Sequence, residues 1–136
     1  MLRVMVVDDE NIVIESIKYI IQKNFDDVEV VATARSGREA IEKAQDVKPD
    51  LIFMDIRMPG INGIDAIREI KSIYPQVEFV IISAYEQFEY AKEAVNLGVV
   101  EYLLKPLNRN KIVEIIRKAD QRLSEARKKM MMELEL

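Results

Sequence analysis

The sequence has neither cysteine nor histidine, and the two absences narrow its chemistry. Without cysteine there are no disulfides, no thiolate nucleophile and no thiolate metal ligands. Without histidine there is no Ser-His-Asp catalysis, no imidazole metal ligand and no phosphohistidine of the protein's own. Carboxylates, amines and hydroxyls are the groups that remain for chemistry.

Long apolar runs are also missing. No stretch is long enough to cross a bilayer, and the short apolar run at the start, broken by Arg3 and closed by Asp8-Asp9, does not have the pattern of a signal peptide. A cytoplasmic protein without a membrane segment is therefore expected. The length of 136 residues and the apolar content of 49% predict one compact domain with a core of its own.

Basic residues are scarce in most of the chain but not at its end. Residues 1–108 carry 12 Lys/Arg against 19 Asp/Glu, whereas residues 109–129 carry 8 against 3. The acidic body argues against direct nucleic-acid binding, which needs a basic footprint. Charges spaced along a helix usually form a solvated face, so the basic stretch does not reverse this expectation.

Apolar runs of strand length alternate five times with segments of helical period, which is the pattern of repeated βα units. Short connections and right-handed crossovers then give a flavodoxin-like (βα)5 fold, a three-layer sandwich around a parallel sheet of strand order 2-1-3-4-5 with an extended C-terminal helix. The predicted strands are Leu2–Val7, Val28–Ala34, Leu51–Met54, Phe79–Ile82 and Tyr102–Leu104.

Helix boundaries and faces can also be predicted. Ser36 and Glu39 have the spacing of a capping box, Pro49 and Pro75 mark helix ends, and Gly98 suits the position after a helix. The side chains expected to face the core are Val13, Ile17, Ile20 and Ile21; Ala40, Ile41, Ala44 and Val47; Ile64, Ile67, Ile70 and Ile73; and Phe88, Ala91 and Val95.

Polar residues follow four of the predicted strands: Asp8-Asp9, Asp55, Ser83 and Lys105. In a parallel α/β sheet these strand ends meet at one crevice, where ligands bind. Clustered carboxylates repel one another by roughly 4 kcal/mol per pair at 4 Å, so a hard divalent cation such as Mg²⁺ is expected among them. Mg²⁺ and Lys105 together suit a phosphoryl group, and Asp55 is the expected nucleophile.

These motifs, taken together, resemble those of a response-regulator receiver domain of two-component signalling. The resemblance rests on five ordered motifs across residues 2–120: Asp8-Asp9-Glu10, Asp55 with Met58-Pro59-Gly60, Asn62-Gly63, Ser83-Ala84 and Lys105-Pro106. It implies a switch that catalyses only its own phosphorylation and dephosphorylation, and is otherwise not an enzyme.

The resemblance also implies roles for the acidic residues. Asp55 would accept a phosphoryl group from the phosphohistidine of a partner sensor histidine kinase. Asp9 and Asp55 would bind Mg²⁺ together with the backbone carbonyl of Arg57, while Asp8 would act mainly through a metal-bound water. Arg57, two residues after Asp55, would also influence phosphate lifetime.

Further roles follow for residues after the last two strands. Lys105 would contact the phosphoryl group and precede a cis peptide bond to Pro106. Ser83 would move toward the phosphate as Tyr102 moves inward, and these two residues would form the switch. Tyr85, two residues after Ser83, would tune hydrolysis.

The stretches 83–91 and 101–106 further resemble receivers that precede helix-turn-helix domains of the arabinose-regulator type, so a transcriptional output is expected. No such domain lies within the sequence. We expect a receiver domain over residues 1–120 and a helical extension or linker over residues 121–136.

Two other classes of function fit the sequence less well. A Mg²⁺-dependent aspartyl-phosphate phosphatase would place its acids in an Asp-x-Asp pattern after the first strand, whereas here Asp8 and Asp9 are adjacent. A non-phosphorylated flavodoxin-like binding module would need an anion cradle at that position, where Asp8-Asp9-Glu10 would repel phosphate. A receiver that takes no phosphate would lack the acid pair, Asp55 or Lys105.

The last helix is longer than the fold requires. A spacing of four and three alternately outlines a coiled-coil seam, which Glu133 interrupts, so a homodimer through this helix is one prediction. The alternative is that Ile112, Ile115, Ile116 and Ala119 cover the sheet and that the rest is an amphipathic extension. The seam positions are Ile112, Ile116, Ala119, Leu123, Ala126 and Met130.

Overall fold

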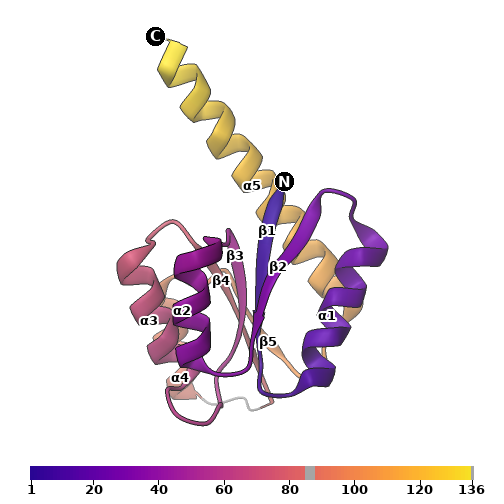
Figure 1. The fold of residues 1–136 in the computed structure, drawn as a ribbon, viewed down its shortest axis with the longest axis vertical. Helices are drawn as coiled ribbons and strands as arrows, with labels where there is room; N and C mark the ends of the chain where they lie inside the picture. Colours follow the sequence, from indigo (N-terminus) through magenta and orange to yellow (C-terminus); the bar gives the residue numbers. More distant parts are fainter. Residues whose placement is uncertain (85–87, 136) are drawn as a thin grey trace.

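The computed structural model describes residues 1–84 and 88–135, without the side chain of Phe88. Strands and helices alternate strictly along the chain (Figure 1). The strands are β1 (Leu2–Val7), β2 (Val28–Ala34), β3 (Leu51–Asp55), β4 (Glu78–Ser83) and β5 (Glu101–Leu104). The helices are α1 (Asn11–Asn24), α2 (Gly37–Val47), α3 (Gly63–Ile73), α4 (Phe88–Leu97) and α5 (Arg109–Glu135).

The sheet is parallel and has the order β2-β1-β3-β4-β5, which confirms the predicted fold. Helices α2, α3 and α4 cover one face, and α1 and α5 cover the other (Figure 1). Both faces of the central strands are therefore buried: Ile52 and Met54 of β3 pack on the first side, and Leu51 and Phe53 on the second. This double burial explains why these strands are continuous apolar runs.

Local signals at the helix ends agree with the prediction. The backbone N–H of Glu39 donates to Ser36 Oγ at 3.2 Å, so Ser36 caps α2. Asn62 caps α3 in the same way, because its side chain accepts from the backbone N–H of Asp65 at 2.9 Å. Gly98 follows α4 with φ of +71°, a conformation that glycine adopts without strain.

Two predicted helix faces were partly wrong. Ile73 is 45% exposed, because three successive steps of three residues rotate its position by about 180° from Ile64 on a helix of 3.6 residues per turn. Val95 is 77% exposed, whereas its neighbour Ala94 is 1% exposed; the side chain of Phe88, which was also predicted to face the core, lies outside the described residues. Tyr90 and Leu97 pack beside Ala94, so the inward stripe of α4 is offset by one residue from the predicted one.

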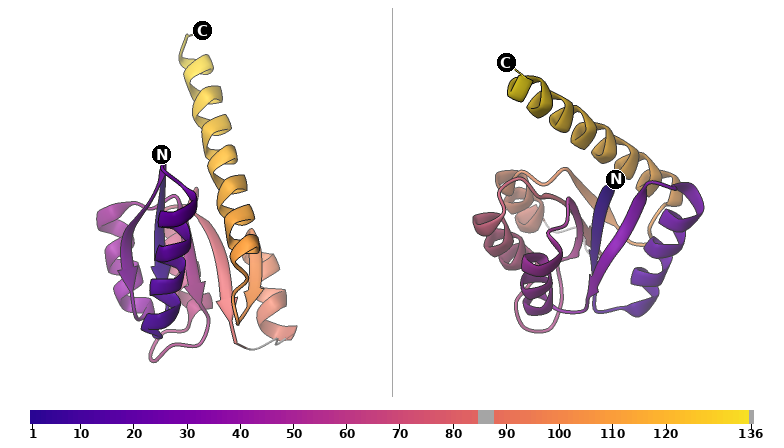
Figure 2. Two further views of the ribbon diagram at one scale, coloured as in Figure 1. Left: turned by 90° about the vertical axis from the view of Figure 1, so that its right-hand side faces the viewer. Right: turned by 45° about the horizontal axis from the view of Figure 1, so that its top comes forward.

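Helix α5 extends far beyond the sheet. Its buried residues end at Ala119 and confirm that Ile112, Ile115, Ile116 and Ala119 cover the sheet, as expected. Leu123 is still partly buried, and residues 124–135 are exposed. This part, here called the extension (residues 121–135), projects past the edge where the strands begin (Figures 1 and 2). Among the described helices, none is both long and apolar enough to cross a membrane.

Candidate functional site

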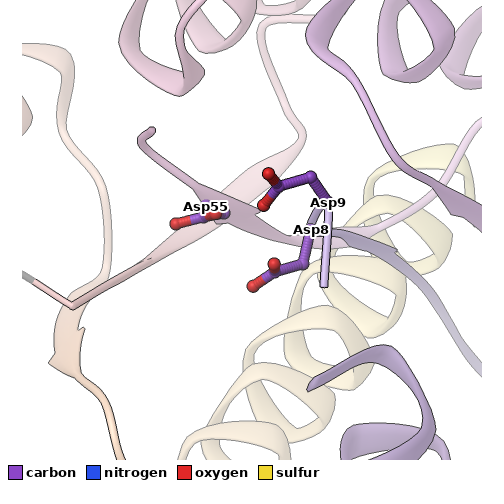
Figure 3. Close-up of side chains that lie close together, drawn as sticks. All are labelled: Asp8, Asp9 and Asp55. Carbon is purple, nitrogen blue, oxygen red and sulfur yellow. The ribbon is translucent and has the colours of Figure 1, made fainter. Parts of the chain in front are cut away.

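The carboxylates of Asp8, Asp9 and Asp55 form a cluster at the edge of the sheet opposite the extension. Asp8 and Asp9 follow β1, and Asp55 ends the neighbouring strand β3. One oxygen of each lies within 4.8 Å of the other two, and the three side chains point toward a common space (Figure 3). The parallel pairing of β1 with β3 is what brings these acids together, as predicted.

Lys105 neutralises part of this charge from the end of β5. Its Nζ lies 3.0 Å from Asp8 Oδ2, 3.8 Å from Asp55 Oδ2 and 3.6 Å from Glu10 Oε2. The peptide bond between Lys105 and Pro106 is cis, as expected. The backbone N–H of Lys105 donates to the carbonyl of Ser83 at 2.8 Å, which ties the end of β5 to the end of β4.

The pKa values of the site reflect first the burial of its charged groups and then the shortage of positive charge among them. Burial, followed by the charge of Asp8, raises the pKa of Asp55 to about 7, although Lys105 opposes the shift. Burial also raises the pKa of Asp8 above its usual range, against a 2.8 Å hydrogen bond from the backbone N–H of Glu10. Burial alone would lower the pKa of Lys105, but its close ion pair with Asp8 and the charge of Asp55 raise it.

The cluster has the properties of a magnesium site. Asp8 Oδ2 is fully buried and has no partner in good hydrogen-bond geometry among the described residues, although Lys105 Nζ lies nearby as a counter-charge. Three carboxylates against one ammonium leave a negative excess that a divalent cation would neutralise. Carboxylate oxygens with space for water are the ligand type that Mg²⁺ prefers, so the residues fit this ion.

The other predicted site residues lie around the cluster. Ser83 ends β4 and is 1% exposed, one residue beyond the pairing of Ile82 with Asp55. Tyr102 lies on β5, half-buried against the core beneath α2, α3 and α4. Arg57 stands two residues after Asp55 with its side chain at the surface. Tyr85 is outside the described residues, so its expected role stays a prediction.

The sequence matches the family model of the response regulator receiver domain over residues 4–117. The match covers most of the chain. The protein belongs to the response-regulator receiver family. Receivers are signalling modules, and the fold and the position of the acidic cluster agree with this assignment.

Similar proteins include receivers of different size. The chain is 40% identical to the chemotaxis protein CheY of Thermotoga maritima over 116 residues, which are 85% of this chain and 95% of that protein. It is 35% identical to the transcriptional regulatory protein YesN of Bacillus subtilis over 83% of this chain but only 31% of YesN. The chain thus spans about a third of that longer relative.

A solved structure shows the same fold. The receiver domain of AraT, a response regulator from Geobacillus stearothermophilus, has a TM-score of 0.85 and 34% sequence identity. The superposition covers 93% of this chain and 98% of the AraT domain. The likeness therefore includes nearly the whole receiver and much of α5.

Two residues that lie within the predicted motifs, but had no predicted role of their own, also shape the receiver's site. Glu10 contacts Lys105 and adds a fourth acid to its surroundings. Gly63 begins α3 directly against the backbone of β3, where a Cβ atom would lie 2.9 Å from the Cα of Ile56 and would also clash with the carbonyl of Asp55. The adjacent Asn62-Gly63 signal marks a helix start but does not reveal this close approach.

Proposed function

We propose that this receiver is a switch controlled by phosphorylation of Asp55. The observation that carries the proposal is the cluster of Asp8, Asp9 and Asp55 with Lys105 at its side, because it combines a nucleophile, a cation site and a fixed positive charge. The phosphatase and carrier alternatives lack comparable support from the geometry.

The phosphoryl group would come from the phosphohistidine of a sensor histidine kinase. A carboxylate oxygen of Asp55 attacks phosphorus, the P–N bond breaks, and its electron pair leaves with the imidazole. Bound Mg²⁺, held by Asp8, Asp9, Asp55 and the backbone carbonyl of Arg57, would supply positive charge to the phosphoryl oxygens. Lys105 adds its ammonium from the other strand end, only 3.8 Å from Asp55 Oδ2.

Ser83 and Tyr102 would report the phosphoryl group to the surface of the receiver. Ser83 is buried beside Asp55 at the end of β4, and Tyr102 lies on the adjacent strand β5. A hydroxyl that turns toward the new phosphate would leave room for the aromatic ring to move inward. Coupling of roughly 1–3 kcal/mol between the two places is enough to shift a pre-existing equilibrium.

The change would reach an output, which we propose to be transcription in the cytoplasm. The name of the longer relative YesN, a transcriptional regulatory protein, supports this, and so does the resemblance to receivers with arabinose-regulator-type outputs. We assign residues 1–120 to the receiver and residues 121–136 to the connection, through which two copies would also associate. Direct nucleic-acid binding by this acidic chain is not part of the proposal.

Phosphorylation can be tested with the purified chain, Mg²⁺ and acetyl phosphate as donor. Intact mass spectrometry should show the addition of one phosphoryl group, and removal of Mg²⁺ with EDTA should suppress it. Asp55→Ala should abolish the increment, while Asp65→Ala, an exposed acid on α3, should leave it unchanged. Undiminished phosphorylation of the Asp55→Ala variant would refute the proposal.

A further inference from the structure

A groove lies between the extension of α5 and the edge of the sheet where the strands begin. It has a volume of about 580 Å³ and lies at the opposite end of the sheet from the aspartate cluster. The extension lines one side with Leu123, Ala126 and Met130, and the body lines the other with Leu2, Tyr74 and Val77. The apolar seam of the extension therefore faces this groove.

The charged side chains around the groove leave an excess of positive charge. Arg122 holds Glu78 at the start of β4 with two hydrogen bonds, of 2.8 and 2.9 Å. Arg127 lies 3.9 Å from Asp50 and donates to the backbone carbonyl of Met1 at 3.3 Å. Lys48 is a third cation on the lining, so three cations face two carboxylates. A negatively charged side chain would be favoured in this groove.

The extension itself carries a suitable acid. The first part of the extension, up to residue 129, is positively charged, and its C-terminal end is negatively charged. Glu133 occupies the seam position that follows Met130 by three residues. Two extensions in parallel would place Glu133 opposite the partner's Glu133 and Arg122 near the partner's Arg127, so like charges would meet twice. Two antiparallel extensions would instead bring each Glu133 close to the positively charged first part of the other extension, so opposite charges would meet.

Burial then decides the register of such a pair. Ile116 and Ala119 are 0% and 2% exposed beneath the sheet, so the first seam residue open to a second helix is Leu123. Placing the partner's Glu133 opposite Leu123 also sets Met130, which is 64% exposed, against the partner's Ala126. In that register the partner's Glu133 enters the groove between Arg122 and Arg127.

We infer that the groove receives the extension of a second copy of this chain, antiparallel, with Glu133 as the residue that selects the orientation. The inference deepens the proposed association through α5 and does not depend on phosphorylation. A single charged residue in a seam commonly fixes orientation and register, which is the role assigned to Glu133 here.

Spin labels can test the orientation directly, because the chain has no cysteine of its own. Gln121→Cys and Glu135→Cys place labels on the exposed side of the extension, seven residues either side of the expected symmetry axis at Lys128. In the antiparallel pair, equivalent labels are offset by about 21 Å along the helix axis, at 1.5 Å per residue, whereas labels 121 and 135 of different copies lie at the same height on the outer sides of the pair.

Double electron–electron resonance should therefore give a longer distance in each singly labelled homodimer than between unlike labels in a one-to-one mixture. Shorter distances in the homodimers than in the mixture would demonstrate a parallel pair and overturn the inference. An absence of any intermolecular distance at high protein concentration would overturn it as well, together with the proposed association. Neither result would touch phosphorylation of Asp55, which is read separately by mass.

A charge reversal at Glu133 tests whether this residue selects the antiparallel orientation. Glu133→Arg should weaken the dimer at least fivefold in sedimentation equilibrium, because it adds a cation to a groove that already has an excess of them. A parallel pair would merely exchange one like-charge contact for another and keep its affinity. Glu135→Arg is the matched control, since it changes the same charge at the tip on the opposite side of the helix, and it should alter affinity less than twofold.

Discussion

The carboxylate of Asp55 should destabilise the fold at neutral and higher pH when no Mg²⁺ is bound. Its pKa of about 7 in the folded protein lies above its ordinary value of 3.8, so the folded state binds more protons between these values. The stability that this proton provides is present at low pH and is lost as the pH rises through 7. From pH 5.5 to pH 8 the loss amounts to about 2 kcal/mol for one group with this shift.

Asp55→Asn removes the charge and keeps the shape of the side chain. At pH 8 in EDTA, the variant should be more stable than the parent by about 4 kcal/mol, the whole cost of a pKa raised from 3.8 to about 7, which moves the urea midpoint upward by roughly 2 M. The comparison is clean because the chain has no histidine, so few other groups titrate in this range. Saturating Mg²⁺ should stabilise the parent and reduce its pH dependence.

Urea unfolding followed by circular dichroism at pH 5.5 and pH 8 measures both effects. A parent whose unfolding free energy is the same at the two pH values would refute the electrostatic argument. So would an Asp55→Asn variant that is less stable than the parent at pH 8. The expected gain from deleting a carboxylate marks Asp55 as a residue kept for chemistry and not for folding.

Three other predictions concern the same site. Mg²⁺ should bind about tenfold more tightly at pH 8 than at pH 6 in titration calorimetry, because the cation competes with the proton on Asp55; equal affinities would contradict the raised pKa. Gly63→Ala should lower the free energy of unfolding, measured with urea, by about 1–3 kcal/mol, because a Cβ atom there clashes with buried backbone. The loss should be larger than that caused by Gly60→Ala, where the space is open but φ is +83°. Ser83→Ala should still take up phosphate but show smaller amide NMR shifts around Tyr102 than the parent, and equal shifts would exclude Ser83 as the reporter.

Much of the fold could be predicted because the relevant signals are local. Doubly buried parallel strands are short apolar runs, and the polar residue that ends each run lies at a known edge of the sheet. For this reason Asp8, Asp9, Asp55 and Lys105 could be placed together from strand ends alone, before any contact was seen.

Other features depend on contacts that local patterns do not contain. Two stripes with the same spacing run along α4, and periodicity could not choose Ala94 over Val95 as the buried position. The bond between Arg122 and Glu78 joins residues 44 positions apart, so the seam prediction could not foresee that the base of the extension is held by its own domain. The close approach of Gly63 to β3 likewise exists only in three dimensions.

The most direct test of the central claim is to locate the phosphoryl group. The chain is phosphorylated with acetyl phosphate and Mg²⁺, reduced with borohydride, which converts an aspartyl phosphate to homoserine, and digested for tandem mass spectrometry. We predict homoserine at position 55 and nowhere else, in proportion to the increment in the intact mass. Homoserine at position 8 or 9, or a mass increment that leaves Asp55 unmodified, would contradict the account.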